Sequence, residues 1–350
     1  MAYTTIDDPS VYFQTTIYTG TGSSQAITNT GNSNLQPDWV WIKNRDGTRD
    51  HYVYDSVRGV NKNLFPNLTN AESTDDNDLM SYNTDGFTLG GEAGVGASGE
   101  TFVSWQWKAG TSFTNDASST GIGSIDSAGS FNNDAGFSII SYTGNGTSGA
   151  SVKHGLSTKP AMMIIKNRDE ADSWQVYHHK NTSAPATETL QLNETGATSD
   201  TSNRWNDTEP TTAIFTLGDN PTVNKNTIKY IGYIFSEIKG YSKFGSYTGN
   251  GNADGTFVYT GFKPAWVLIK WVGGTSDWYI YDNKINPFNV MSKVFAPNIA
   301  NAEITTSRLM DFTSNGFKNR GSGNTTNASG ENYIYMAFAE NPFVTSTGVP

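Results

Sequence analysis

The chain has 350 residues, no Cys and a formal net charge of −10, with 23 Lys and Arg against 33 Asp and Glu. An acidic chain without a basic stripe argues against nucleic-acid binding, which depends on neutralised phosphates, and the missing thiols exclude disulfides and thiolate zinc sites. No apolar run approaches the roughly 20 residues of a membrane-spanning helix, and the N-terminus lacks the basic and apolar regions of a signal peptide. We therefore expect a protein that is made in a cytoplasm and does not insert into membranes.

The composition favours short strands joined by many turns. The chain holds 36 Gly, 13% of its residues are aromatic and only 16% are charged. Gly, Ser and Asn are typical of turns, and aromatic side chains are typical of strands. No window longer than about ten residues has the apolar spacing of an amphipathic helix.

Three stretches of the chain repeat the same landmarks in the same order, and this is the strongest signal in the sequence. Each stretch opens on the same triplet: Tyr18-Thr19-Gly20, Tyr142-Thr143-Gly144 and Tyr247-Thr248-Gly249. An apolar run ending in Ile-Lys follows: Trp39-Val40-Trp41-Ile42-Lys43, Met162-Met163-Ile164-Ile165-Lys166 and Trp266-Val267-Leu268-Ile269-Lys270. Next come His51-Tyr52-Val53-Tyr54, Trp174-Gln175-Val176-Tyr177 and Trp278-Tyr279-Ile280-Tyr281, and then Phe87, Phe215 and Phe317. Aromatic runs close the stretches at residues 102–107, 230–235 and 333–338.

These landmarks divide the chain into three modules of about 100 residues, a usual domain size. We predict a first module with an N-terminal arm over residues 1–110, a second over 136–239 and a third with a C-terminal tail over 240–350. Residues 1–10 and 344–350 are expected to be peripheral segments. Residues 111–135 are rich in Gly, Ser and Asn and are predicted to form a flexible linker or a lightly ordered extended arm. The second and third modules follow one another almost directly, so we expect them to pack as a rigid pair.

The runs themselves predict antiparallel β-sandwiches. The run from Trp39 to Lys43 is continuously apolar until its last residue, which is typical of a central strand covered on both sides. Asp85-Gly86 and Asn315-Gly316 supply the positive φ angles of tight hairpin turns. We predict an all-β protein of three repeated antiparallel β-sandwich modules of jelly-roll type.

The search for reactive groups finds no repeated catalytic or metal-binding set. The run Asp75 to Asp78 lacks the alternate spacing and central Gly of a calcium loop, and the adjacent His178 and His179 are expected on opposite faces of a strand. The Gly-rich residues 93–99 are not followed by a helix with a phosphate-binding Lys, and we predict a mobile loop. Glu72 and Glu303 match between modules and are interpreted as a turn or inter-module contact. We predict no catalytic residue, no cofactor and no metal.

Binding is the remaining kind of function. Most Trp residues lie on the repeated landmarks, which favours core packing over a glycan-stacking role. Trp205 and Trp271 lie outside the closely matching landmarks and are the better candidates for exposed rings. Polar loops on a rigid sandwich commonly carry binding, so we add Asn193, Asn206 and Asn324 as candidate ligand contacts.

Several segments resemble a repeat family of tailed phages that infect marine bacteria. They are Tyr3-Thr4-Thr5-Ile6-Asp7-Asp8-Pro9, Trp105-Gln106-Trp107-Lys108-Ala109-Gly110-Thr111, the run from Gly240 to Gly251 and the run from Tyr333 to Phe343. The resemblance covers nearly the whole chain. It implies a virion structural protein with laminin-G-like or lectin-like sandwiches, and it carries no established catalytic residues.

Two classes of function follow from these observations. The first is a tail fibre or host-recognition protein whose loops contact a cell-surface receptor or glycan. The second is a capsid decoration or head-fibre protein that contacts other virion proteins, and a surface-polysaccharide depolymerase is a distant third. We expect a homo-oligomer, and a trimer in particular, because virion appendages are usually symmetric and because the chain has more aromatic residues than three separate modules need to bury.

Overall fold

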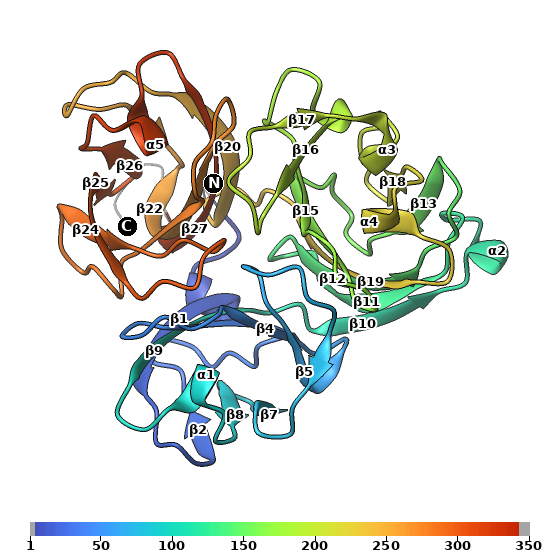
Figure 1. Cartoon of the computed structure of the whole chain (residues 1–350), viewed down its shortest axis with the longest axis horizontal. Helices are drawn as coiled ribbons and strands as arrows, with labels where there is room; N and C mark the ends of the chain where they lie inside the picture. Colours follow the sequence, from blue (N-terminus) through green and yellow to red (C-terminus); the bar gives the residue numbers. More distant parts are fainter. Residues whose placement is uncertain (1–3, 343–350) are drawn as a thin grey trace.

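Three β-sandwich modules surround a common centre in the computed structural model, which describes residues 4–342. Figure 1 shows them as three lobes: the first in blue, the second in green and yellow, and the third in orange and red. Each lobe consists of an inner sheet that faces the centre and an outer sheet that faces away from it. The inner sheet has at least as many strands as the outer sheet. The prediction of an all-β fold of three antiparallel sandwiches is confirmed.

The first module follows a short 3₁₀ helix, η1 (Pro9–Val11). Its inner sheet contains, in spatial order, β1 (Phe13–Thr19), β9 (Thr101–Trp107), β3 (Trp39–Asn44), β4 (Tyr52–Asp55), β5 (Gly59–Leu64) and β6 (Ser73–Thr74). Its outer sheet contains β2 (Gln25–Ile27), β8 (Phe87–Leu89) and β7 (Leu79–Tyr82), and α1 (Ala93–Gly96) precedes β9.

The second module has the largest sheet. Its inner sheet contains β10 (Thr111–Asn115), β11 (Ser127–Asn132), β12 (Phe137–Thr143), β19 (Lys229–Phe235), β14 (Met162–Asn167), β15 (Gln175–His178), β16 (Glu188–Gln191) and β17 (Ser199–Asp200). Its outer sheet contains β13 (Ala150–Lys153) and β18 (Ile214–Leu217). Its short helices are α2 (Ala117–Thr120), η2 (Pro185–Thr187), α3 (Ser202–Trp205) and α4 (Pro221–Asn224).

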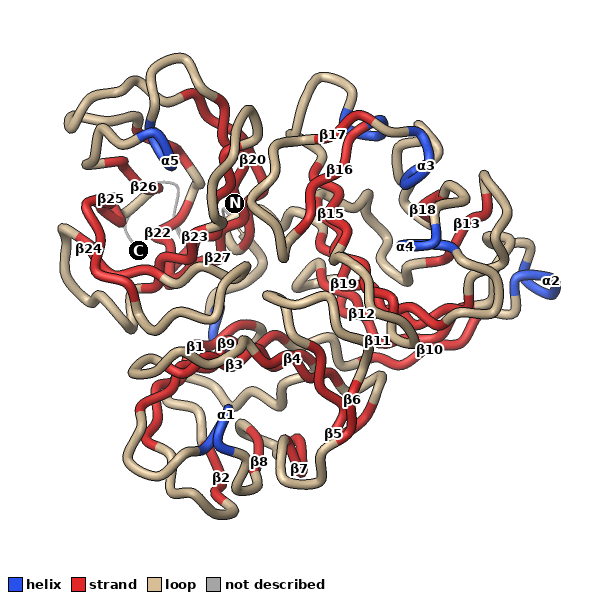
Figure 2. The backbone as a smooth tube through the Cα atoms, viewed as in Figure 1, coloured by secondary structure: helices blue, strands red, loops and turns tan. Residues whose placement is uncertain are grey.

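The third module has two sheets of equal size. The inner sheet contains β20 (Ser242–Thr248), β27 (Asn332–Pro342), β22 (Phe262–Trp271) and β23 (Tyr279–Asp282). The outer sheet contains β21 (Phe257–Tyr259), β26 (Gly316–Asn319), β25 (Ile304–Thr313) and β24 (Met291–Val294), and α5 (Asn324–Asn327) precedes β27. Figure 2 shows that the inner sheets of the three modules converge on the centre.

Both faces of the inner strands are buried, because each inner sheet contributes to two cores. One face packs on the outer sheet of its own module, and the other joins a core shared by all three modules. Every residue of the Trp39 to Asn44 strand is therefore buried. The double coverage predicted for this run is confirmed, and the second covering layer is the neighbouring modules.

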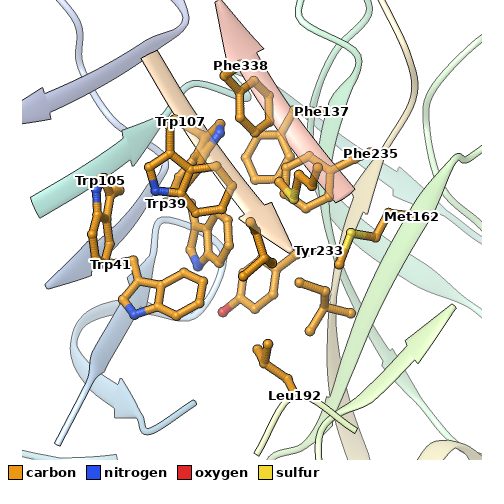
Figure 3. Packing of buried hydrophobic residues seen from close by; sticks show 14 of the residues in the cluster. Trp39, Trp41, Trp105, Trp107, Phe137, Met162, Leu192, Tyr233, Phe235 and Phe338 are labelled. Carbon is orange, nitrogen blue, oxygen red and sulfur yellow. The ribbon is translucent and has the colours of Figure 1, made fainter. Parts of the chain in front are cut away.

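Aromatic rings from different modules pack against one another in the shared core. Trp39 stacks on Tyr233 of the second module with 4.6 Å between ring centroids, and Phe13 stacks on Phe338 of the third at 5.1 Å. Figure 3 shows Trp39 and Trp107 of the first module beside Phe137 and Phe235 of the second. The surplus aromatic residues are thus buried inside a single chain, so they do not support the predicted homotrimer, which stays a prediction.

The repeated Tyr-Thr-Gly triplet anchors a short helix in each module. The hydroxyl groups of Tyr18, Tyr142 and Tyr247 donate to the carbonyls of Val95, Val223 and Thr326, each at 2.7 Å. The Gly two residues later passes so close to the segment after the helix that a Cβ on Gly20 would lie 2.4 Å from the Ala97 carbonyl oxygen. The Gly-rich residues 93–99 therefore include the packed helix α1, and the prediction of a mobile loop is wrong.

Two predictions about the connections are also wrong. Residues 111–135 form β10, α2 and β11, and these strands extend the inner sheet of the second module through the pairings of β10 with β11 and β11 with β12. The N-terminal arm packs inward rather than lying at the periphery, because Ile6 belongs to the shared core and is 3% exposed. The C-terminal tail over 344–350 lies outside the described residues.

Candidate binding site on the third module

The three repeated lysines tie each module to the next. Lys43 of the first module donates to the Ala300 carbonyl of the third at 3.2 Å, Lys166 donates to Thr69 of the first at 3.1 Å, and Lys270 donates to Thr195 of the second at 2.9 Å. Burial lowers the pKa of each of the three ammonium groups to about 8. These lysines satisfy buried carbonyl groups at the junctions between modules.

The matched glutamates lie in the same junctions. Arg45 of the first module pairs with Glu303 of the third at 2.7 Å, and Arg168 of the second pairs with Glu72 of the first at 2.8 Å. The backbone carbonyl oxygens of Arg45 and Arg168 also accept hydrogen bonds from the amides of Glu303 and Glu72. At the remaining junction, Val272 and Thr198 occupy the positions of this pair, and the Thr198 amide donates to the Val272 carbonyl oxygen without an accompanying ion pair. Glu72 and Glu303 are inter-module contacts, one of the two interpretations made from the sequence.

The histidines likewise serve the structure. His51 Nε2 lies 3.1 Å from the Ala296 carbonyl oxygen of the third module, while its Nδ1 accepts from Trp41. Trp174 and Trp278 replace His51 in the other modules, and each indole donates to a carbonyl of the preceding module. His178 and His179 both reach carbonyl oxygens of the third module, on Tyr335 and Phe244.

The two candidate Trp rings lie in different modules and do not form a common binding site. Trp205 is fully buried, packs edge-on against Tyr177 and donates to the Glu188 carbonyl oxygen at 3.0 Å. Its predicted exposure is wrong, because the ring fills the sandwich core of the second module. Trp271 is partly buried in the third module and donates to Glu331 at 2.9 Å.

The three candidate Asn residues lie apart from one another in the fold. Asn193 is 9% exposed and accepts from the Trp174 amide, as Asn67 and Asn298 do for His51 and Trp278. It therefore shapes a junction and is not part of an open contact loop. Asn206 caps α3 with a positive φ of 53° and accepts from Ser148. Asn324 is exposed at the start of α5.

The acidic run in the first module is held by neighbouring amides. Asp78 accepts from the Asn63 side chain, and Asp76 accepts from Asn61 at 3.0 Å. Within residues 4–342, no group of three or more His, Asp or Glu side chains is placed to hold a metal ion. No helix in the same part of the chain is long and apolar enough to cross a membrane.

The outer sheet of the third module carries exposed aromatic rings. Phe257 and Tyr259 are 44% and 54% exposed, and they lie on the same face of β21 because Val258 between them points into the sandwich. The equivalent positions are fixed by the pairing of Val258, Ile27 and Val152 with the repeated Phe residues. These positions hold Ala26 and Thr28 in the first module and Ser151 and Lys153 in the second.

Charged groups adjoin these rings on the same sheet. Lys318 is the cross-strand partner of Phe257 and pairs with Asp254 at 2.5 Å, while Arg320 lies 3.3 Å from Asp311. β21 is one of the two edge strands of its sheet among the described residues. In the second module, by contrast, the amides of Ser124 and Ile125 donate to Ser151 and cover the equivalent edge. We define the outer face of the third module by Phe257, Tyr259, Lys318, Asp311 and Arg320.

This face was not predicted from the sequence. Phe257 and Tyr259 were not among the candidates, since they belong to none of the repeated landmarks. The signal that identifies them is the comparison of β21 with β2 and β13, where a shared inward residue is flanked by different outward residues. That comparison requires the strand register, which the structure supplies.

Comparisons with known proteins place the whole three-module body in one family. No curated protein and no solved structure matches the chain. A family model described as a domain of unknown function, DUF7483, matches residues 8–342, which include every described strand of the three modules. The chain therefore belongs to the DUF7483 family.

Proposed function

We propose that the chain is a non-enzymatic virion structural protein that recognises a host-surface glycan through the outer face of the third module. The observation that carries the proposal is the exposed pair Phe257 and Tyr259, at positions where the other two modules hold small or polar residues. Aromatic rings offer large apolar area with little conformational entropy to lose. The charged groups beside them supply the few polar contacts that orient a ligand.

The three-module body supports a binding role for this face. Its repeated Lys side chains, the Arg–Glu pairs, and the His and Trp side chains at matching positions are engaged in junction contacts, so the modules hold one another in place. Binding surfaces on rigid strands keep their geometry better than surfaces on loops. The assignment to a virion rests on the resemblance to the marine-phage repeat family.

The internal threefold arrangement favours capsid decoration as a second candidate function. A body with three similar lobes around one axis matches the symmetry of a threefold position on a shell, and oligomeric particles are built on such symmetry. In that case the outer face would contact a shell protein in place of a glycan.

A double variant tests the proposed function. Phe257→Ala with Tyr259→Thr copies the corresponding residues of the first module, Ala26 and Thr28. We expect the variant to fold as the wild type does and to bind host cells at least about tenfold more weakly, the loss that ~1.4 kcal/mol produces. Binding is measured with fluorescently labelled full-length protein on host cells.

A matched control removes a different exposed aromatic ring. Phe288 is 82% exposed in the loop before β24, and Phe288→Ala should leave host binding unchanged. Unchanged binding by the double variant would contradict the proposal. Coating of empty capsids by the full chain, without binding to cells, would favour decoration, and release of reducing sugar ends from host polysaccharide would favour an enzyme.

A further inference from the structure

The second and third modules carry matching side chains at one corner of their inner sheets. The correspondence is fixed by register, since Met162 pairs with Phe235 and His178 as Trp266 pairs with Phe338 and Asp282. The equivalent residues around this corner are then Ala161 and Ala265, His179 and Asn283, Lys180 and Lys284, and Glu237 and Glu340.

The backbone places these residues together in both modules. The His179 amide donates to the Ala161 carbonyl at 2.8 Å, and the Asn283 amide donates to the Ala265 carbonyl at 2.9 Å. The turn that carries the lysine is therefore fixed beside the entry to the neighbouring strand. The glutamate follows two residues after the Phe that pairs with that strand.

Each corner borders a cleft. The cleft of the second module has a volume of about 540 Å³, and Thr182 and Ser183 are among the residues that line it. The cleft at the corner of the third module has a volume of about 290 Å³, and residues of the first module, including Asp8 and Asn32, line it together with Asn341. These volumes are close to the range of about 300–1,000 Å³ that is usual for small-molecule sites.

Most charged groups of the two clefts have partners. Asp8, which lines the cleft of the third module, accepts from the hydroxyl groups of Ser10 and Ser33, each at 2.7 Å. Glu237 pairs with Lys243, and Glu340 pairs with Lys263, each at 2.6 Å. Lys159, which also lines the first cleft, pairs with Glu209. Within residues 4–342, the ammonium groups of Lys180 and Lys284 are exposed and make no ion pair or side-chain hydrogen bond.

The first module is an internal contrast. Its residues at the positions of the lysine and the glutamate are Val57 and Ala109. Val57 packs against the shared core, and Ala109 belongs to it. The repeat therefore does not require charge at this corner for folding, and the matching Lys and Glu of the other two modules call for another explanation.

We propose that the two clefts are equivalent sites for a carboxylate-bearing saccharide, with Lys180 and Lys284 binding the carboxylate. In each cleft the ammonium group that has no ion-pair partner provides a charge-assisted contact for the single carboxylate of a uronate. A doubly charged phosphate would bring a second negative charge close to Glu237, or to Asp8 and Glu340. The surrounding hydroxyl and amide groups both donate and accept hydrogen bonds, as the hydroxyl groups of a sugar require.

The two sites stand independently of the outer face of the third module, because they share none of its residues. Loss of host binding in the Phe257 and Tyr259 variant therefore says nothing about the clefts. A glycan with several uronate units would gain avidity from two sites on one rigid body.

The test uses sodium D-glucuronate as the probe and D-glucose as its neutral counterpart, with the full-length protein. Saturation-transfer NMR measures binding across a titration of each sugar. We expect glucuronate to bind and glucose to bind about tenfold more weakly, as loss of one charge-assisted contact implies. Lys180→Val and Lys284→Val, which introduce the residue found in the first module, should each remove about half of the glucuronate signal, and the double variant should remove it.

Lys225→Val is the matched control, because Lys225 is an exposed lysine of the second module that pairs with Glu170 outside the cleft. It should leave the titration unchanged. Near-ultraviolet circular dichroism confirms that each variant retains the wild-type tertiary packing. Three results would overturn the proposal: no glucuronate binding by the wild type, full binding by the double variant, or equal binding of glucose.

Discussion

Two junctions between modules have different charges at the same strand position. We call the contact of the first and second modules the first junction, and the contact of the third and first modules the second junction. Asp55 and Asp282 are equivalent, since each pairs with the first Trp of the Ile-Lys strand. Asp55 accepts from Tyr233 of the second module and forms a fully buried ion pair with Arg58. Asp282 accepts from Thr15 and Trp105 of the first module and has no cation among the partners of its carboxylate.

The contrast shows that equivalent junctions can have the same strand pairing and yet differ in charge, since only Asp55 has a cationic partner. Burial raises the pKa of Asp282 to about 6, although four hydrogen bonds lower it in part. At Asp55 the guanidinium of Arg58 supplies the missing charge, and the neighbouring carboxylate raises the pKa of Arg58 against the effect of burial. The equivalent position of the second module holds the neutral ring of His178, whose pKa burial lowers to about 3.

The largest expected effect comes from breaking the ion pair at the first junction. Arg58→Met keeps the length of the side chain but leaves the Asp55 carboxylate buried without its cation, which costs about 3–5 kcal/mol. Equilibrium unfolding in urea should show this loss in the free energy of unfolding. Arg320→Met is the control, because Arg320 is 38% exposed and its ion pairs are screened by solvent, so it should cost less than about 1 kcal/mol. Similar losses in the two variants would contradict the assignment.

At the second junction, the contribution of Asp282 to the free energy of unfolding should depend on pH. The pKa of Asp282 is higher in the folded chain, at about 6, than the ordinary value of 3.8. The folded state therefore binds more protons in this window, and the contribution of Asp282 to stability declines as pH rises from about 4 to 6. The shift corresponds to up to ~3 kcal/mol.

Asp282→Asn isolates this contribution, because Asn does not titrate. We expect the difference in unfolding free energy between wild type and variant to be larger at pH 4 than at pH 7, by up to ~3 kcal/mol. The comparison between the two proteins cancels the opposite slope from His178, whose lowered pKa makes the fold lose stability as pH falls below about 6.5. A difference that does not change with pH would show that Asp282 titrates normally.

The sequence predicted the three modules and the strand class correctly because these depend on local apolar patterns that recur. It did not predict what covers the inner strands. The run from Trp39 to Lys43 indicates burial on two sides, but a pattern in one strand does not identify the opposing layer. The aromatic surplus was accordingly assigned to contacts between chains, whereas Trp39 meets Tyr233 of the same chain.

The wrong predictions for the linker and for Trp205 concern residues without a recurring apolar pattern. β10 and β11 are rich in Ser, Thr and Asn, and their backbone hydrogen bonds hold them in the sheet while only a few side chains, such as Phe113 and Phe131, pack beneath them. Trp205 sits outside the repeated landmarks because α3 is particular to the second module. The equivalence of Asn67 and Asn298 was visible in the repeats, and it would have identified Asn193 as a junction residue.

The smallest expected effect is the difference in stability cost between two Thr→Val variants. One loses a hydrogen bond to the charged Asp282, and the other loses a hydrogen bond to a neutral amide nearby. The Thr15 hydroxyl donates to the Asp282 carboxylate at 2.7 Å, and the Thr16 hydroxyl donates to the Asn29 amide oxygen at 2.8 Å. Both threonines are buried on the same strand. Thr15→Val should cost about 1.5–2 kcal/mol at pH 7, and Thr16→Val about 1 kcal/mol, because a hydrogen bond to a charged group contributes more than one to a neutral group.

The pH dependence of the two costs separates them further. The Thr15 hydroxyl lowers the pKa of Asp282, so Thr15→Val raises that pKa and penalises the ionised carboxylate. Its cost should therefore fall between pH 7 and pH 4, where Asp282 is protonated in the folded chain, while the cost of Thr16→Val should stay constant. Urea unfolding of both variants at the two pH values measures this. A constant cost for Thr15→Val would mean that its partner is already neutral at pH 7, and that the two junctions differ in their hydrogen bonds but not in charge.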